Sequence, residues 1–305
     1  MSLTRGERLR SMYKCFQSTG VHCLIKQQGN YQVIGCGDDL GYFLYSTIFS
    51  YYLNLDPLIG ANILFYVIAA VGLFGMGICY FKMANSKFSI VVILAGLGRI
   101  CMPLIGLNIV YIAYFFACLF IPLLLLVDIK KTKKNLIGIS FLGGLICSFS
   151  DNIRILSSLP SVIFYLIFLI FSSKWSKKLK LLSLLFFMSG YGVLVYHFNY
   201  EIQRRNIFLK ENNIPLPNRE NHVFWHNIYT GFGFLINNHG IEWKDKCSID
   251  AALAVNPHAK YPSKLYEETI KSLLFKLLTE KTYFVMTTIF AKLGVILYFF
   301  LIYFG

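Results

Sequence analysis

The chain has 305 residues, of which 56% are hydrophobic and only 14% are charged. Because a typical soluble domain carries about 25% charged residues, this composition argues against a soluble globular protein. The formal net charge is +14, but much of the basic excess lies in short connectors between apolar blocks, so it does not indicate nucleic-acid binding.

The N-terminal segment carries a pair of adjacent acids. Residues 1–36 contain neither a long apolar helix nor a signal-peptide core, and the sequence GDDLGY then places Asp38 and Asp39 before a predicted helix at 40–53. Asp39 suits the N-cap of that helix, which leaves Asp38 unexplained. The helix has aromatic residues on one face, as expected for a helix at a membrane interface. This stripe consists of Tyr42, Tyr45, Phe49 and Tyr52.

Seven apolar blocks follow the acidic pair. About 20 apolar residues are needed to cross the core of a bilayer, and most of the blocks reach that length. The two that flank residues 150–158 are shorter, and we expect one or both to be tilted or partly re-entrant. We therefore predict an all-α polytopic membrane protein with about seven transmembrane helices. The blocks are Leu58–Phe81, Phe88–Gly106, Ile109–Ile129, Leu136–Phe149, Leu159–Phe171, Leu181–Phe198 and Phe284–Phe304.

The basic connectors predict the orientation of these helices. Lys82 and Lys87, then residues 130–135 and 173–180, fall on one side when the spans are counted alternately. The positive-inside rule makes that side cytoplasmic, so we expect a multi-pass protein of the cytoplasmic (inner) membrane. Because this orientation requires export of the N-terminus, either a further helix lies upstream of Met1 or the first segment crosses by a less usual route, and we favour the upstream helix.

The predicted organisation has four regions, and the two on the outer side are the N-terminal segment and one larger loop. The regions are an exported segment with the acidic motif and an interfacial helix (1–57), a helix bundle (58–198), an exported loop or lobe (199–283) and a final transmembrane helix (284–305).

Eight cysteines are spread along the chain. Several lie in or beside spans, where cysteine is usually a small buried hydrophobe. Their spacing shows neither a disulfide framework nor a zinc pattern, although any two of the exported ones could pair. The exported cysteines are Cys15, Cys23, Cys36 and Cys247.

The predicted lobe contains two informative stretches. In HVFWHNIY, the side chains of His222, Trp225, His226 and Tyr229 share one face if the stretch is helical. No glutamate lies between the histidines, which argues against a catalytic zinc site of the H-E-x-x-H type. Aromatic side chains beside histidine suit a surface that faces a sugar or a polyprenol, and simple packing is the alternative. Residues 263–281 predict an amphipathic helix that lies on the outer membrane surface.

Two arginines lie at membrane depth, where ionisable side chains are costly and are functional candidates. Arg99 is near the middle of the second apolar block, and Arg154 follows Asp151 at the outer end of a short helix pair. The guanidinium of Arg154 could bind a phosphate with two hydrogen bonds. The alternative is an Asp151–Arg154 pair that caps a bend.

This layout resembles that of the GT-C membrane glycosyltransferases, in particular the bacterial branch related to the protein O-mannosyltransferases and aminoarabinose transferase. In that family an Asp-Asp or Asp-Glu pair in the first exported loop is followed by a tyrosine, and GDDLGY supplies Asp38, Asp39 and Tyr42. The stretches FWHNIYTGFGF and IRILSSLP also resemble bacterial members. The chain departs from the family in having no helix before the acidic loop and in ending at Gly305, directly after a span, so a truncated relative is expected.

The resemblance implies a hexosyltransferase-type enzyme. It would move a sugar from a polyprenyl-phosphate donor to a hydroxyl of a lipid, glycan or protein acceptor. Asp38 would act as the base and Asp39 as its helper. Adjacent carboxylates repel, which favours a divalent cation, Mg or Mn, at Asp39. The expected substrate-binding residues are Tyr42, Arg154, His222, Trp225 and His226.

Membrane lipids are the other expected partner, and no nucleic acid is expected. Two different functions stay open. A transporter or lipid-carrier flippase would need polar residues along the spans and an inverted repeat, of which the sequence shows little. A non-catalytic truncated relative would bind a partner through its loop, and its acidic pair would be only a helix cap and a surface turn.

Overall fold

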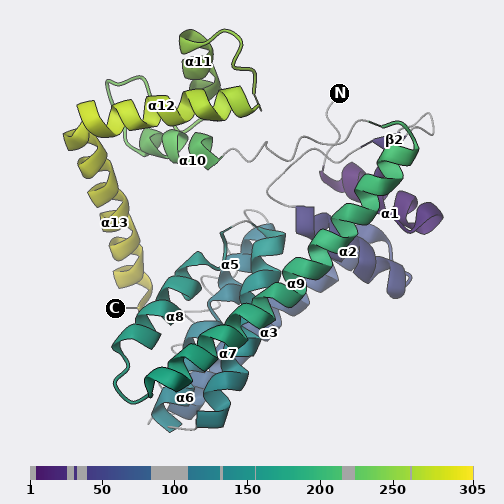
Figure 1. Cartoon of the computed structure of the whole chain (residues 1–305), viewed down its shortest axis with the longest axis vertical. Coiled ribbons are helices and arrows are strands. Elements are labelled where there is room, and N and C mark those ends of the chain that lie inside the picture. The colour runs from purple at the N-terminus through teal and green to yellow at the C-terminus, as the bar shows by residue number, and fades with distance from the viewer. Residues whose placement is uncertain are drawn as a thin grey trace. The chain divides into compact units, whose positions relative to one another are not determined.

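Figure 1 shows the computed structural model of the protein, in which the chain's contacts form two units, Met1–Leu216 (unit 1) and Pro217–Gly305 (unit 2). The structure describes residues 5–25, 31–32, 40–83, 109–130, 133–154, 156–214, 224–261 and 263–304. The second predicted span, Phe88–Gly106, lies outside these ranges. So do the predicted functional residues Asp38, Asp39, Arg99 and His222.

Unit 1 is a helical bundle, and its only β-structure in the described ranges is a two-residue antiparallel pair, β1 (Leu24–Ile25) with β2 (Tyr31–Gln32). Its helices in chain order are α1 (Arg5–Thr19), α2 (Leu40–Tyr52), α3 (Pro57–Met83), η1 (Ile109–Tyr111), α5 (Ile112–Ala117), α6 (Phe120–Lys130), α7 (Lys133–Ile153), α8 (Leu159–Phe171) and α9 (Lys177–Glu211).

Four helical stretches of the described chain are long and apolar enough to cross a membrane, so the structure agrees with a multi-pass membrane protein. Of the seven predicted spans, four correspond to these long stretches. Two more, α8 and the start of α13, are shorter apolar helices. The long stretches are Pro57–Met83, Ile109–Asp128, Asn135–Ile153 and Lys177–Glu211.

The α9 helix has 35 residues and is about 52 Å long, well beyond the thickness of a bilayer core. It continues past residue 198, where the sequence placed the end of the bundle. Its polar last turns therefore extend beyond the apolar part of the helix.

The α7 and α9 helices cross in direct backbone contact. A Cβ atom at Gly144 would overlap the carbonyl oxygen of Phe187, and one at Gly190 would overlap that of Phe141. Small residues permit this close approach between apolar helices. The contact fixes the end of α7 beside the middle of α9.

The α2 helix was predicted at 40–53 and is found at 40–52, but it lies inside unit 1 rather than along a surface. Tyr42 is buried against Phe65, and Tyr45 contacts Phe149. Of the aromatic stripe, Tyr52 alone is strongly exposed. The stripe therefore serves mainly for packing, in contrast to the interfacial helix that we expected.

The described basic connectors lie at one end of unit 1 and the N-terminal helix lies at the other. The carboxylate of Asp128 pairs with Lys174 and accepts a hydrogen bond from Trp175 at 3.2 Å, which joins α6 to the α8–α9 connection. At the opposite end, Arg204 in the last turns of α9 donates to the carbonyl oxygen of Gly20 at 3.2 Å. The alternating count of spans predicts the same arrangement.

Unit 2 consists of α10 (Phe224–Gly231), η2 (Phe232–Phe234), α11 (Asp245–Val255), α12 (Lys264–Glu280) and α13 (Thr282–Phe304). The α12 helix confirms the predicted amphipathic helix. Its apolar residues Tyr266, Ile270 and Leu274 pack into the core of unit 2, so they are not free to lie on a membrane as we expected. Glu267, a charged residue of the same helix, is buried as well.

Candidate functional site

A groove with a volume of about 550 Å³ opens where the end of α7, the start of α8 and the middle of α9 meet. Its walls are mostly apolar, and three of its lining residues carry polar side chains: Asp151, Ser158 and Tyr191. Leu156 and Met188, which line it, are 50% and 62% exposed, so the groove is open to the surroundings of the bundle. Its volume lies within the range of about 300–1,000 Å³ that is usual for ligand pockets.

The polar end of the groove is organised by the carboxylate of Asp151. One carboxylate oxygen accepts hydrogen bonds from the backbone N–H of Ser158 at 2.8 Å and from the hydroxyl of Ser157 at 3.4 Å. The other accepts from the hydroxyls of Ser158 at 2.6 Å and Tyr191 at 2.9 Å. We call these four residues the hydroxyl cluster. Because the Ser158 and Tyr191 hydroxyls donate to Asp151, their lone pairs can accept hydrogen bonds from a ligand.

Local backbone geometry explains how the cluster forms. The chain turns sharply after α7, with Leu156 at a φ of 62°, a conformation that is costly for a side chain with a Cβ. The bond from Ser158 N–H to Asp151 satisfies an otherwise free donor at the start of α8. Asp151 therefore fixes the turn between the two helices and orients Tyr191 on a third helix.

Arg154 lies at the same turn, and its carbonyl accepts a hydrogen bond from the backbone N–H of Ser157 at 3.1 Å. Its backbone N–H donates to the carbonyl of Ser150 at 2.9 Å, and its guanidinium lies over the ring of Tyr111, 5.5 Å from the centroid. The Asp151 carboxylate is already occupied by four donors from the hydroxyl cluster. Arg154 belongs to the turn beside the polar end of the groove, but it is not one of the residues that line the groove.

The start of α2 is fixed against the end of α7. A Cβ atom at Gly41 would overlap the backbone carbonyl of Asn152, and the Asn152 side chain donates to the Tyr45 hydroxyl at 3.0 Å. Asn152 also donates to the Leu194 carbonyl at 3.4 Å. The helix that follows Asp38 and Asp39 in the sequence therefore begins beside Asp151 and Arg154.

Tyr42, a predicted substrate-binding residue, lies in the core of unit 1. It is buried against Phe43 and Phe65, and the guanidinium of Arg5 lies 5.6 Å from its ring centroid. These contacts give Tyr42 a packing role at the start of α2.

Two more predicted residues, Trp225 and His226, belong to a buried network in unit 2. His226 is 1% exposed, with Nδ1 2.6 Å from the hydroxyl of Tyr266 and Nε2 3.2 Å from Asp245. Burial raises the pKa of Tyr266, so its hydroxyl stays protonated. We assign the tyrosine as donor to Nδ1 and the Nε2–H group as donor to Asp245. Because Tyr266 is fully buried, this Asp–His–Tyr set connects α10, α11 and α12 rather than presenting a nucleophile.

Glu267 completes this network at the start of α10. Its carboxylate accepts hydrogen bonds from the backbone N–H groups of Trp225 at 2.9 Å and His226 at 3.4 Å. A carboxylate at the N-terminus of a helix is stabilising. The ring of Trp225 lies 5.3 Å from the ammonium of Lys271, which leaves it packed on α12.

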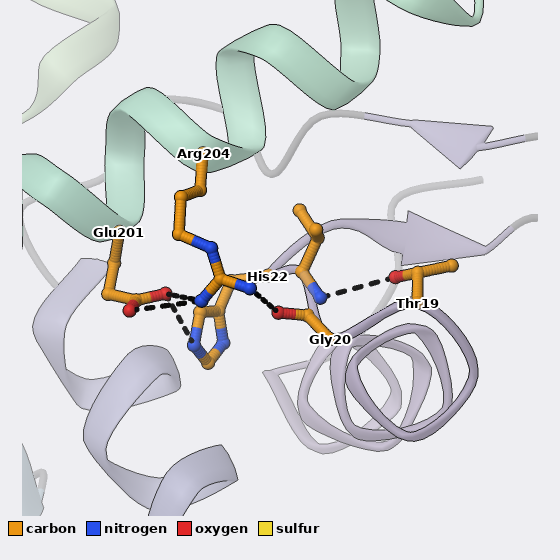
Figure 2. Close-up of polar contacts among 6 residues, drawn as sticks. Thr19, Gly20, His22, Glu201 and Arg204 are labelled. Atoms are coloured by element: carbon orange, nitrogen blue, oxygen red, sulfur yellow. Dashed lines mark hydrogen bonds and ion pairs between the residues drawn. The ribbon is translucent and has the colours of Figure 1, made fainter.

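Sequence reasoning missed a buried histidine in unit 1, shown in Figure 2. His22 is 3% exposed, is stacked on Phe16 with 4.4 Å between ring centroids, and lies 3.7 Å from a carboxylate oxygen of Glu201. Within the described ranges, neither ring nitrogen has a hydrogen-bond partner. Burial, with smaller effects of Arg204 and Arg205, lowers the pKa of His22 to about 3, so the ring is neutral and its contact with Glu201 is not an ion pair.

The same region contains a disulfide between Cys15 and Cys23, whose Cα atoms are 5.8 Å apart. These are two of the four cysteines that the sequence placed on the exported side, and only the structure selects this pairing. The bridge joins the last turn but one of α1 to the residue that follows His22.

In the described ranges, no three His, Cys, Asp or Glu side chains come close enough together to hold a metal ion. The predicted metal ligand Asp39 lies outside those ranges, as do Asp38 and His222.

No protein-family model matches the chain, and no curated protein or solved structure gives a significant match to it.

Proposed function

We propose that the protein is a membrane glycosyltransferase of the GT-C type. In this proposal, the groove binds a lipid-linked sugar, and Asp38 or Asp39 acts as the base at the outer face of the cytoplasmic membrane. The observation that carries the proposal is the groove itself, which has apolar walls and a polar end beside the helix that follows the acidic pair.

The walls of the groove suit a lipid chain. Leu159 and Val162 of α8 lie opposite Met188 and Val195 of α9, and both helices are apolar. A long isoprenoid or acyl chain could enter from the bilayer without crossing water, because lining residues on both sides are exposed to the surroundings of the bundle. A water-soluble sugar nucleotide would gain little from such walls.

The polar end supplies two kinds of contact for a head group. The oxygen atoms of Ser158 and Tyr191 can accept hydrogen bonds from sugar hydroxyls. Arg154 can bind a phosphate and stabilise the charge that develops on it as it leaves.

The proposed reaction is a substitution at the anomeric carbon of the donor. The acceptor hydroxyl forms a new C–O bond, the bond to the lipid phosphate breaks, and its electron pair stays on the phosphate oxygen. A carboxylate takes the hydroxyl proton as charge develops. We assign Asp38 as this base and Asp39 as its helper, with Mg or Mn as a cation that Asp39 could bind.

The disulfide supports the orientation that this proposal needs. Disulfides form and persist in oxidising compartments, which for a bacterial membrane protein lie outside the cytoplasm. Cys15 and Cys23 lie near the last turn of α2 and the last turns of α9, and the Asp128–Lys174 pair is at the opposite end of α9.

The test is a transfer assay in membranes with radiolabelled polyprenyl-phosphate sugars, comparing wild type with Asp38→Asn and Asp39→Asn. We expect loss of the base to lower transfer by at least about 100-fold. Asp128→Asn is the matched control, because this acid lies at the other end of unit 1. Equal transfer by both acidic-pair variants and wild type would overturn the proposed role of the pair.

A second pair of variants tests the groove. Val162→Trp would fill the space between α8 and α9, and we expect it to raise the KM for the lipid-linked donor. Leu166→Trp, on the same helix and exposed, should leave KM unchanged. Movement of the lipid between leaflets without sugar transfer would instead indicate a flippase.

A further inference from the structure

The loop between η2 and α11, residues 235–244, has an unusual surface for a protein segment in water. Ile236 is fully exposed, and Trp243 is 69% exposed with its ring edge-on to Phe234 at a centroid distance of 5.7 Å. We call this segment the Ile236 loop. Large apolar groups at an exposed turn need a partner that covers them.

Four backbone groups of this loop are bonded to one of its own side chains. The side-chain amide of Asn237 donates to the carbonyls of Leu235 and Ile241, both at 2.8 Å. Its oxygen accepts from the N–H groups of His239 at 3.0 Å and Ile241 at 3.4 Å. One side chain thus replaces water as the partner of four backbone groups.

Cys247 and Gly240 complete the loop. The Cys247 thiol donates to the Gly240 carbonyl at 3.0 Å, and the Glu242 N–H donates to the sulfur at 3.3 Å. Gly240 has a φ of +70°, which a residue with a side chain adopts only at a cost. Irregular backbone tolerates a water-poor environment only when its polar groups are paired in this way.

The loop lies along the first turns of α13, the last apolar helix of the chain. The ring of His239 contacts Phe284 at a centroid distance of 4.6 Å, and the ammonium of Lys292 lies 5.6 Å from the ring centroid of Phe234. The first contact is made by the loop and the second by η2, directly before it, and the two residues of α13 lie eight positions, or about 12 Å, apart along the helix axis. The loop therefore runs beside the part of α13 that would enter the membrane first.

The exposed surface of α13 is largely apolar over the same turns, with Thr282 and Thr287 as its exposed polar residues. Tyr283 is almost fully exposed at the start of the helix, and Met286, Ile289 and Phe290 are exposed after it. Lys292 interrupts this apolar sequence, but its side chain is directed to Gly231 and Phe234 and can extend toward the helix start. Large apolar side chains are thus exposed both on the first turns of α13 and on the loop that contacts them.

We propose that the Ile236 loop inserts into the interface of the lipid bilayer, with Ile236 among the lipid chains and Trp243 at head-group depth. Tryptophan and tyrosine favour this depth because one part of the ring is apolar and another is polar. The exposed ion pair between Glu242 and Lys244, 2.7 Å apart, borders Trp243 and stays in water or among the head groups. The loop therefore anchors unit 2 to the membrane in addition to α13.

The test is fluorescence quenching of the full-length protein in vesicles of phosphatidylethanolamine and phosphatidylglycerol that contain brominated phosphatidylcholine. The Trp243 emission is obtained as the difference between wild type and Trp243→Phe. The matched control is the Trp225 emission, obtained from Trp225→Phe, because this ring packs under Lys271 in the same unit. We expect brominated lipid to quench Trp243 at least about twofold more than Trp225.

A variant with a charge at the tip of the loop gives a second test of the proposed insertion. Ile236→Asp should reduce the quenching of Trp243 by lipid and increase its quenching by acrylamide, while hydrogen exchange of α12 stays unchanged. The proposal would be overturned if acrylamide quenched Trp243 in the wild-type protein as strongly as free tryptophan while brominated lipid had no effect. It would also be overturned if Ile236→Asp left both kinds of quenching unchanged.

Discussion

The two units each bury a histidine almost completely, but the hydrogen bonding of the two rings differs. In unit 2, both ring nitrogens of His226 have hydrogen-bond partners, Tyr266 and Asp245. In the described part of unit 1, neither ring nitrogen of His22 has one, although Glu201 lies 3.7 Å away. The first ring connects three helices through polar bonds, and the second is held by packing and by its covalent neighbours.

This difference separates two ways of stabilising a segment that contains a buried histidine. A buried polar group costs free energy unless it is paired, and pairing makes its loss costly in turn. The stability of unit 2 therefore depends on the hydrogen bonds of the His226 side chain. The N-terminal part of unit 1 depends on the Cys15–Cys23 disulfide, the Phe16 ring and the contact of Arg204 with Gly20.

The largest effect that we expect comes from His226→Ala. It removes two hydrogen bonds, leaves the buried hydroxyl of Tyr266 without a partner and opens a cavity. We expect a loss of about 3 kcal/mol from the stability of unit 2. Hydrogen exchange of α10 and α12 in detergent micelles would measure it. His258→Ala, which changes an exposed histidine of the same unit, is the control, and an equal loss in both variants would contradict the network.

The sequence predicted the elements of unit 2 better than their polar contacts. The period of Tyr266, Ile270 and Leu274 is local, so it predicted α12 correctly. It could not predict that Glu267 is buried, because the partner of that carboxylate is the start of α10, 42 residues away in the sequence. A charge on the polar side of a helix is ordinarily solvated, and tertiary structure reversed that expectation.

The candidate site in unit 1 shows the same limit. SFSDNIRILSSLP drew attention to Asp151 and Arg154 and suggested that the two side chains pair. The structure shows Asp151 bonded to Ser157 and Ser158 in the same stretch, but also to Tyr191 on a distant helix. The close α7–α9 contact that brings Tyr191 near had one indication in the sequence, the small residues within two apolar blocks.

The disulfide offers the next test of the comparison. It closes a loop of eight residues, and the chain-entropy estimate for such a loop is about 2.5 kcal/mol. The double variant Cys15→Ala with Cys23→Ala should therefore increase hydrogen exchange in α1 about 70-fold. Exchange in α12 of the same molecules is an internal control and should not change. Unchanged exchange in α1 would mean that packing alone holds the segment.

The free energy of unfolding of unit 1 should depend more strongly on pH in the wild-type protein than in a variant without His22. The pKa of His22 is lowered from 6.5 to about 3 in the folded state, so between these values only the unfolded chain binds the proton. Unit 1 therefore keeps its full stability above pH 6.5 and becomes less stable as the pH falls toward 3. We expect a loss of about 1.4 kcal/mol for each pH unit below 6.5, or about 2 kcal/mol by pH 5.

Thermal melting in detergent between pH 7 and pH 5 would measure this effect, with His22→Phe as the control that lacks the titrating ring. The charged and titratable groups near the His22 ring belong to α9. They are Glu201, Arg204, Arg205 and His197. Parallel pH curves for the two proteins would mean that the His22 ring is solvated or protonated in the folded state.

The smallest expected effect is that of His22→Phe at pH 7, and this variant tests directly whether the His22 ring nitrogens form hydrogen bonds. A phenyl ring keeps the stacking on Phe16 and removes two buried nitrogens that have no partners. Replacing unpaired polar groups by apolar ones of similar shape is nearly neutral, so we expect a change within about 1 kcal/mol. His226→Phe removes nitrogens that are paired and should cost about 2–3 kcal/mol more than His22→Phe does. Equal costs in the two variants would show that His22 forms hydrogen bonds too, and the two units would then be stabilised in the same way.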